Sequence, residues 1–199
     1  LTPMFGAMLV PPNDWGLDSI GAYNSPKLAA MTPLVKNMPK EQKSVLDSQI
    51  REGKMEKPLR AINSLQRVPL VINDYVLDAV LWARKKPELH RSLKKFPKLD
   101  SSFIQPVKRL PKAEFEKLKP EEQMERKQEF GEVRKLRDEI KANLKNFATM
   151  EAEAKELLNE DRFYLPHQFD TRGRIYHATD FGHHNADYIR SLFLFADYA

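Results

Sequence analysis

The strongest hydrophobic periodicity in the chain lies between residues 120 and 160. Apolar residues recur there at spacings of three, four and seven, which places them on one narrow helical stripe: Val133, Leu136, Ile140, Leu144, Phe147, Ala154 and Leu158. Pro120 suits the first position of a helix, and Glu121 and Glu122 complement the positive end of its dipole. The pattern predicts one long helix over residues 120–160.

A second helical pattern covers residues 58–86. Its apolar residues recur at spacings of three and four and share one face: Ile72, Val76, Ala79, Val80 and Ala83. Pro69 interrupts the pattern, so it either starts a second helix or kinks a longer one, and Pro87 helps to end the run. Because residues 87–118 combine four prolines with many lysines and arginines, they predict a basic tip between two long antiparallel helices.

The pattern changes after residue 161. Apolar residues alternate over 163–169, as a strand requires, and residues 170–173 read Asp-Thr-Arg-Gly, with the first and fourth residues that a type I turn prefers. Residues 174–178 predict a returning strand, and residues 181–185 predict another turn. From Asp187 onward the density of apolar residues predicts a helix.

The first 57 residues show little periodicity. Residues 11–16 combine Pro, Asn, Asp and Gly, which favours turns, and Trp15 is expected to pack this loop against a neighbouring segment. Residues 39–53 predict a short helix that ends at Gly53. The chain is therefore expected to be α+β and mainly α, with an irregular part at 1–57, a helical part at 58–160 and a hairpin-containing part at 161–199.

Composition narrows the classes of protein. The chain has 199 residues, of which 41% are hydrophobic and 31% are charged, and it contains no cysteine. Disulfides, thiolate chemistry and cysteine-based zinc sites are thereby excluded. No apolar run is long enough for a transmembrane helix, and no secretory signal precedes the first turn. These features predict a cytoplasmic protein.

The net charge of +5 is unevenly distributed. Residues 84–119 carry 12 Lys and Arg against 4 Asp and Glu, an excess of 8, which is typical of a segment that contacts a phosphate backbone. Lys94 and Lys95 are candidates in this segment, and a solvated basic loop is the equally weighted alternative. Arg134, Arg137 and Lys141 flank the stripe of the long helix, where they are either solvated beside glutamates or face a nucleic acid.

The C-terminal part also carries the candidate chemistry. Four of the five histidines lie there: His167, His177, His183 and His184. Their spacing matches no standard metal site, so no metal is expected, and packing around a loop is the simpler interpretation. Phosphate-binding glycine loops, nucleophile elbows and zinc-protease helices are absent from the sequence.

The turn at residues 170–174 has the composition of a phosphate grip. Arg172 and Arg174 can each bind phosphate oxygens in a bidentate manner. Asp170 can accept N–H groups of the arginines or of the backbone and hold them in place, and Tyr176 can stack or donate a hydrogen bond. An ordinary hairpin with exposed arginines is the alternative.

The segment FYLPHQFDTRGRIYHATDFGHHNADYIRSLFLFA closely resembles the start of the palm in single-subunit DNA-directed RNA polymerases of the phage and mitochondrial type. Its signature is the Asp-x-x-Gly-Arg sequence at residues 170–174, followed by Tyr176 and by a turn with Asn185 and Asp187. MFGAMLVPPNDW is similar to the segment ahead of the thumb in that family, and AINSLQRVPLVINDYVLDAV to its first thumb helix.

The resemblance implies a role for each residue of the turn. The Asp-x-x-Gly-Arg loop of the family contacts the template strand of the RNA–DNA hybrid beside the active site. Arg172 and Arg174 would then contact the backbone, Asp170 would order the loop, and Gly173 would allow close approach of the backbone. Tyr176 would line the path of the template, and the segment 84–119 would lie near the nucleic acid.

The resemblance also implies a partner. The aspartates that bind two Mg²⁺ ions in the family, and its fingers residues, come later than residue 199, so this chain alone is expected to be inactive. A larger polymerase subunit would supply them on a DNA template, with the apolar C-terminal helix packed against it. The other interpretation is that the chain is a truncated piece of a longer polymerase. Accessory proteins that open the duplex are further candidate partners, and the cytoplasm would be that of the host cell if a phage encodes the chain. The alternatives are a non-enzymatic helical nucleic-acid-binding or scaffold module and a metal site built from the terminal histidines.

Overall fold

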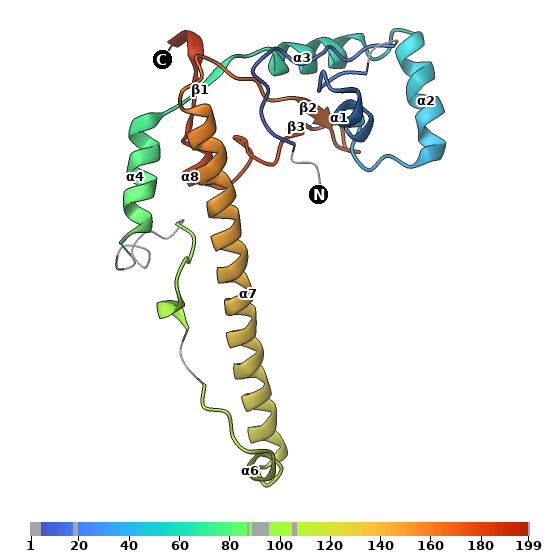
Figure 1. Cartoon of the computed structure of the whole chain (residues 1–199). Coiled ribbons are helices and arrows are strands. Elements are labelled where there is room, and N and C mark those ends of the chain that lie inside the picture. The colour runs from blue at the N-terminus through green and yellow to red at the C-terminus, as the bar shows by residue number, and fades with distance from the viewer. Residues whose placement is uncertain (1–4, 18–19, 87, 89–95, 105–106, 199) are drawn as a thin grey trace. The chain divides into compact units, whose positions relative to one another are not determined.

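The computed structural model describes residues 5–17, 20–86, 88, 96–104 and 107–198. The chain forms two units, Leu1–Leu77 with Ala152–Ala199, and Asp78–Glu151. The division falls within two helices, α4 (Asp74–Arg84) and α7 (Pro120–Leu157), which are labelled in Figure 1. Among the described residues, no helix has the length and apolarity that crossing a membrane requires.

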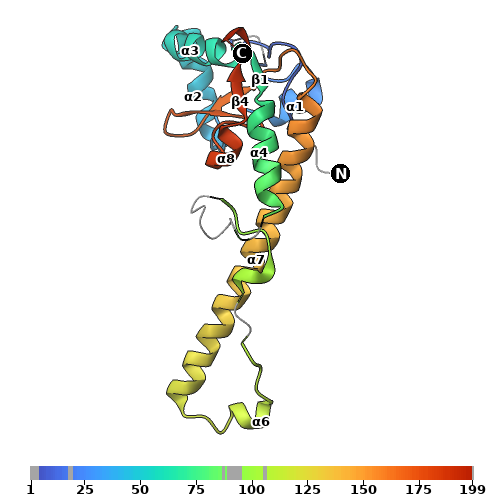
Figure 2. The same ribbon diagram turned by 90° about the vertical axis from the view of Figure 1, so that its left-hand side faces the viewer.

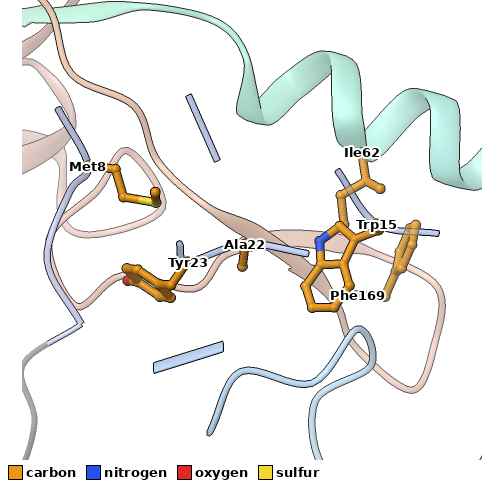
Figure 3. Close-up of a cluster of buried hydrophobic side chains, with 6 residues drawn as sticks. All are labelled: Met8, Trp15, Ala22, Tyr23, Ile62 and Phe169. Carbon is orange, nitrogen blue, oxygen red and sulfur yellow. The ribbon is translucent and has the colours of Figure 1, made fainter. Parts of the chain in front are cut away.

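The first unit begins with three helices, α1 (Pro26–Met31), α2 (Lys40–Arg51) and α3 (Glu56–Gln66). Its core joins distant parts of the chain, as Figure 3 shows, through six buried residues: Met8, Trp15, Ala22, Tyr23, Ile62 and Phe169. The indole Nε1 of Trp15 donates to the carbonyl oxygen of His167 at 2.9 Å. The prediction that Trp15 anchors its loop is therefore confirmed, and its partner lies in the hairpin.

The region predicted as helix over 58–86 is interrupted by a strand. After α3, β1 (Leu70–Ile72) pairs in antiparallel register with β4 (Phe193–Phe195), Val71 opposite Leu194, and α4 follows. Pro69 therefore neither starts nor kinks a helix, because it directly precedes a strand. Its carbonyl oxygen accepts the N–H of Ala196 at 3.0 Å, an interaction 127 residues away in sequence that no local pattern reveals.

The predicted hairpin is confirmed at the other end of this unit. Strand β2 (His167–Phe169) pairs with β3 (Ile175–His177), and Gln168 lies opposite Tyr176. The predicted helix after Asp187 is wrong in extent, because α8 (Asp187–Arg190) makes a single turn before β4 and a short 3-10 helix, η2 (Ala196–Tyr198). Pairing with β1 satisfies one side of the backbone of this apolar segment, in place of helical hydrogen bonds.

The second unit is built around α7, which confirms the long helix predicted over 120–160. Ile140, Phe147 and Met150 are buried, whereas Leu144 is 39% exposed, so the apolar stripe is only partly covered. The segment that precedes α7 in the sequence contains the 3-10 helix η1 (Ser101–Phe103) and helix α6 (Lys112–Phe115). It runs alongside α7 (Figures 1 and 2). Hydrogen bonds from Asn143 to the Lys98 carbonyl (3.1 Å) and from Arg126 to the Lys108 carbonyl (3.4 Å) attach it.

The fold is α+β and mainly α, as predicted, but the antiparallel helix pair is unequal. Helix α4 has 11 residues against 38 in α7. The guanidinium of Arg84, at the end of α4, pairs with Glu151 and lies 5.1 Å from the ring centroid of Phe147. Pro97 and Pro111 disfavour a second long helix there, and the described residues 96–104 and 107–111 are irregular apart from the 3-10 helix η1.

Candidate nucleic-acid interface

The hairpin of β2 and β3 presents the turn predicted to grip phosphate. The N–H of Asp170 donates to the Arg174 carbonyl at 2.8 Å, and the N–H of Gly173 donates to the Asp170 carbonyl at 3.0 Å. Gly173 has a φ of +78°, a conformation that side-chain-bearing residues rarely adopt. The positive φ favours glycine at this position, whereas lack of space does not, because an added Cβ would meet no atom within 4 Å.

The carboxylate of Asp170 organises the turn. One oxygen, Oδ1, accepts the backbone N–H groups of Arg172 and Arg174, both at 2.9 Å. The other, Oδ2, accepts the Nε–H of Arg174 at 2.8 Å and lies 2.7 Å from its NH2 nitrogen. These hydrogen bonds, first of all that from the Arg174 backbone, lower the pKa of Asp170 because they stabilise the ionised form. These contacts are the ones through which Asp170 would order the turn, as the sequence predicts.

The two arginines of the turn differ in their availability. Arg174 is held on both sides, because Asp170 binds its guanidinium and the ring centroid of Tyr176 lies 5.5 Å from its Cζ atom. Arg172 is exposed, and within the described part of the chain its guanidinium has neither a hydrogen bond nor an ion pair. The guanidinium N–H groups of Arg172 are therefore available to a ligand, whereas those of Arg174 help to hold the conformation of the turn.

The other predicted cations lie on α7. Arg134, Arg137 and Lys141 are exposed, and no ion pair to a described residue holds any of them. The predicted glutamate partners at helical spacing are thus not engaged. Lys94 and Lys95 lie outside the described residues.

The four terminal histidines do come together, as predicted, in a packed cluster. The rings of His177 and His184 stack with centroids 4.7 Å apart, and His183 lies 4.4 Å from His184 and 5.9 Å from His167. The His177 Nε2 atom accepts the N–H of His184 at 3.1 Å, so its Nδ1 atom carries the proton toward the Thr179 carbonyl at 2.9 Å. This arrangement requires a neutral ring, and burial lowers the pKa of both His167 and His177 to about 4.

The histidine cluster does not have the geometry of a metal site. Throughout the part of the chain that the structure describes, no group of three or more His, Cys, Asp or Glu side chains could hold a metal ion. The histidine rings instead pack the loop after β3 against the hairpin. Packing around a loop is the simpler of the two interpretations that the sequence allows.

One chemically unusual residue, Glu153, was not predicted from the sequence. Glu153 is only 7% exposed, and neither carboxylate oxygen accepts a hydrogen bond from the described residues. Burial, with the negative charges of Asp180 and Glu156, raises the pKa of Glu153 to about 7. Its helical position could have revealed it, because Glu153 lies three residues after Met150 and four before Leu157, on the face that α7 buries.

No protein-family description matches the chain. The chain is similar to the mitochondrial DNA-directed RNA polymerase of Neurospora crassa, with 27% identity over 196 residues. The similarity covers 95% of this chain but 13% of that polymerase. It therefore extends well upstream of the terminal hairpin and supports a function related to DNA-directed RNA polymerases.

Proposed function

We propose that this chain is one of two subunits of a DNA-directed RNA polymerase that is related to the single-subunit, phage-like enzymes. It contributes the thumb, with α7 as its main helix, and the first part of the palm, with the hairpin of β2 and β3. The observation that carries the proposal is the turn at 170–174, in which one carboxylate accepts the backbone N–H groups of two arginines and binds the guanidinium of Arg174 beside an aromatic ring, leaving that of Arg172 free. The similarity to a mitochondrial polymerase supports it independently.

The turn binds the template strand of the RNA–DNA hybrid through Arg172. Its free guanidinium donates two parallel hydrogen bonds to phosphate oxygens. Asp170 and Arg174 keep the turn in the conformation that presents Arg172, so little conformational freedom is lost on binding. Tyr176, beneath Arg174, borders the path of the template.

The cations of α7 act differently. Arg134, Arg137 and Lys141 carry no fixed partner among the described residues, and lysine and arginine on an exposed helix contribute a sequence-independent attraction for phosphate. This attraction concentrates the hybrid at the thumb, whereas the turn holds one strand in a defined position. The segment 84–119, with its excess of positive charge, adds to the same field.

Polymerisation requires a second polypeptide. The described residues of this chain bring together no group of three or more His, Cys, Asp or Glu side chains that could hold a metal ion. A larger subunit supplies the metal-binding aspartates and the fingers. This chain binds and orients nucleic acid for that subunit and is inactive alone.

Arg172→Ala tests the proposal. The variant and wild type are titrated with a fluorescein-labelled RNA–DNA hybrid, and Arg60→Ala, which removes one exposed positive charge from α3, is the matched control. We expect roughly tenfold weaker binding for Arg172→Ala, which removes a charge-assisted bidentate hydrogen bond, and a much smaller effect for Arg60→Ala. Equal effects of the two variants would favour a generic nucleic-acid-binding module, and no effect of either would favour a scaffold.

A further inference from the structure

Strand β4 is an edge strand. On one side of the sheet, the N–H and C=O groups of Leu70 exchange hydrogen bonds with Phe163, both at 2.8 Å. The residues on either side of β1 face β4, since Asn73 N–H donates to the Leu192 carbonyl at 2.8 Å and Ala196 N–H donates to the Pro69 carbonyl. Strand β1 therefore lies between Phe163 and β4, and β4 has β1 as its one described neighbour.

This hydrogen-bond phase determines which groups β4 leaves unpaired. Leu194, opposite Val71, directs its backbone toward β1. Phe193 and Phe195 then direct their N–H and C=O groups to the other side, because these directions alternate along a strand. The C=O of Phe195 directly precedes η2 and takes part in the i→i+3 bonding of that helix. No hydrogen bond to the described residues satisfies the N–H and C=O of Phe193 or the N–H of Phe195. Such an edge is a template for an added strand.

A pocket of about 480 Å³ adjoins this edge. Most of its wall is apolar, and it draws on β1, β3 and β4 as well as the end of α3, with Leu65, Leu70, Leu165, Ile175, Phe193 and Phe195 among its lining residues. Phe193 is fixed in the wall, since its ring centroid lies 4.9 Å from that of Phe181. Leu194 and Phe195 are 38% and 58% exposed. The edge and the pocket thus form one surface.

The charged groups around the pocket favour an uncharged occupant. Arg190 lines it but is paired with Asp187. His183 and His184 also line it, and burial lowers the pKa of both below the ordinary value, which keeps them neutral near pH 7. An extended backbone with apolar side chains satisfies both the edge and the pocket.

We propose that β4 receives an extended, apolar segment of the second polymerase chain as the third strand of its sheet, with one large side chain in the pocket. The inference rests on the proposed function. The similarity spans only 13% of the Neurospora polymerase, so most of the polypeptide of a polymerase of that kind lies outside the matched part and is a source for such a strand. Because Ile175 of the phosphate-gripping hairpin lines the pocket, the added strand joins the second chain to the hairpin that carries Arg172.

Photocrosslinking in the assembled complex tests the position of the partner. Phe195→p-benzoylphenylalanine is introduced into the chain in the cells that make the polymerase, the complex is irradiated, and the crosslinked peptides are sequenced by mass spectrometry. Tyr75, which is 81% exposed on α4, takes the same substitution as a control. We expect the Phe195 variant to crosslink to a separate chain with polymerase sequence, and the control not to. Crosslinks to a second copy, to the same chain, or to an unrelated protein would overturn the proposal.

A pair of variants at the same residue tests strand addition itself. Phe195→Pro removes the outward N–H but leaves the ladder to β1 intact, as proline does on edge strands, and Phe195→Leu keeps both the N–H and an apolar side chain. We expect the proline variant to lose at least about tenfold in recovery of the second chain and the leucine variant to retain it. Equal recovery with the two variants would overturn strand addition.

Two further measurements separate the ways in which these experiments can fail. The melting temperature of each purified variant shows whether the unit still folds. Hybrid binding that still depends on Arg172 in the same preparations shows that the proposed function holds even where the docking proposal fails.

Discussion

Asp170 and Glu153 are carboxylates of the same unit, and their surroundings are opposite. Asp170 lies at the surface and accepts hydrogen bonds from two backbone N–H groups and one guanidinium. Glu153 lies on the buried face of α7 and accepts none from the described residues. The pKa of Asp170 is lowered and that of Glu153 is raised to about 7, because the first environment stabilises the charge and the second opposes it.

The difference shows how each region uses its carboxylate. The turn keeps its charge at neutral pH, and that charge fixes the cation beside it. The buried face of α7 has negative neighbours, Asp180 and Glu156, in place of a cation. Ionisation therefore orders the turn and destabilises the core.

Glu153 gives the largest expected effect. Its pKa is raised in the folded state, so the unfolded chain releases the proton first and stability falls as the pH rises from about 4.5 to about 7. Glu153→Gln removes this penalty, and we expect its melting temperature to exceed that of wild type by several degrees at pH 8, with little difference at pH 4.5. Thermal unfolding at both pH values measures it.

The matched control is Glu129→Gln, an exposed residue of the same helix whose charge does not contribute to the raised pKa of Glu153. The low pKa values of His167 and His177 also make stability depend on pH, with the opposite sign: stability falls as the pH drops from about 6.5 to about 4. Because both variants keep these histidines, the difference between variant and wild type isolates Glu153. A difference that is constant across pH would contradict the assignment.

Asp170→Asn tests the other side of the comparison. The amide keeps the size of the side chain but loses the negative charge that holds Arg174. We expect roughly tenfold weaker binding of an RNA–DNA hybrid, with a small change in melting temperature because the turn is exposed. Arg190, paired with Asp187 on α8, provides the control: Asp187→Asn breaks an exposed pair of the same type outside the turn. Equal losses of hybrid binding would show that the position of Asp170 is unimportant.

The turn could be predicted from sequence because its determinants are local. Asp at the first position, Gly at the fourth and alternating apolar residues before it specify the hairpin within a dozen residues. Which arginine would be free could not be predicted, since both lie within reach of Asp170. Only the closed turn shows that Arg174 takes the carboxylate and Arg172 does not.

The sheet of β1 and β4 could not be predicted for the opposite reason. Leu70–Ile72 and Phe193–Phe195 are each short apolar runs that fit a helix or a strand equally well. Their pairing joins segments more than a hundred residues apart, so tertiary contact decides the outcome. Glu153 was missed because a charged residue within a charged helix attracts no notice until the apolar phase around it is considered.

Gly173→Ala measures the backbone cost of the turn. With φ at +78° and no atom within 4 Å of the added Cβ, any destabilisation comes from conformation and not from a clash. We expect about 1 kcal/mol of destabilisation in urea unfolding. Gly131→Ala, inside α7 and equally free of neighbouring atoms, should have the opposite sign and gain about 0.5–1 kcal/mol. Two changes of the same sign would show that the turn imposes no special conformation.

The cations of α7 give the smallest effects and contrast most directly with Arg172. Alanine at Arg134, Arg137 or Lys141 should weaken hybrid binding only about twofold to threefold each, and the slope of log affinity against log salt should fall by about 0.9 for each phosphate that is no longer neutralised. At high salt these effects should vanish, since ion release is their source. The weaker binding of Arg172→Ala should persist, because the hydrogen bonds of Arg172 are held in a fixed geometry. Titration at three salt concentrations distinguishes the two behaviours, and an effect at Arg172 that vanishes with salt would place the turn in the same class as the helix.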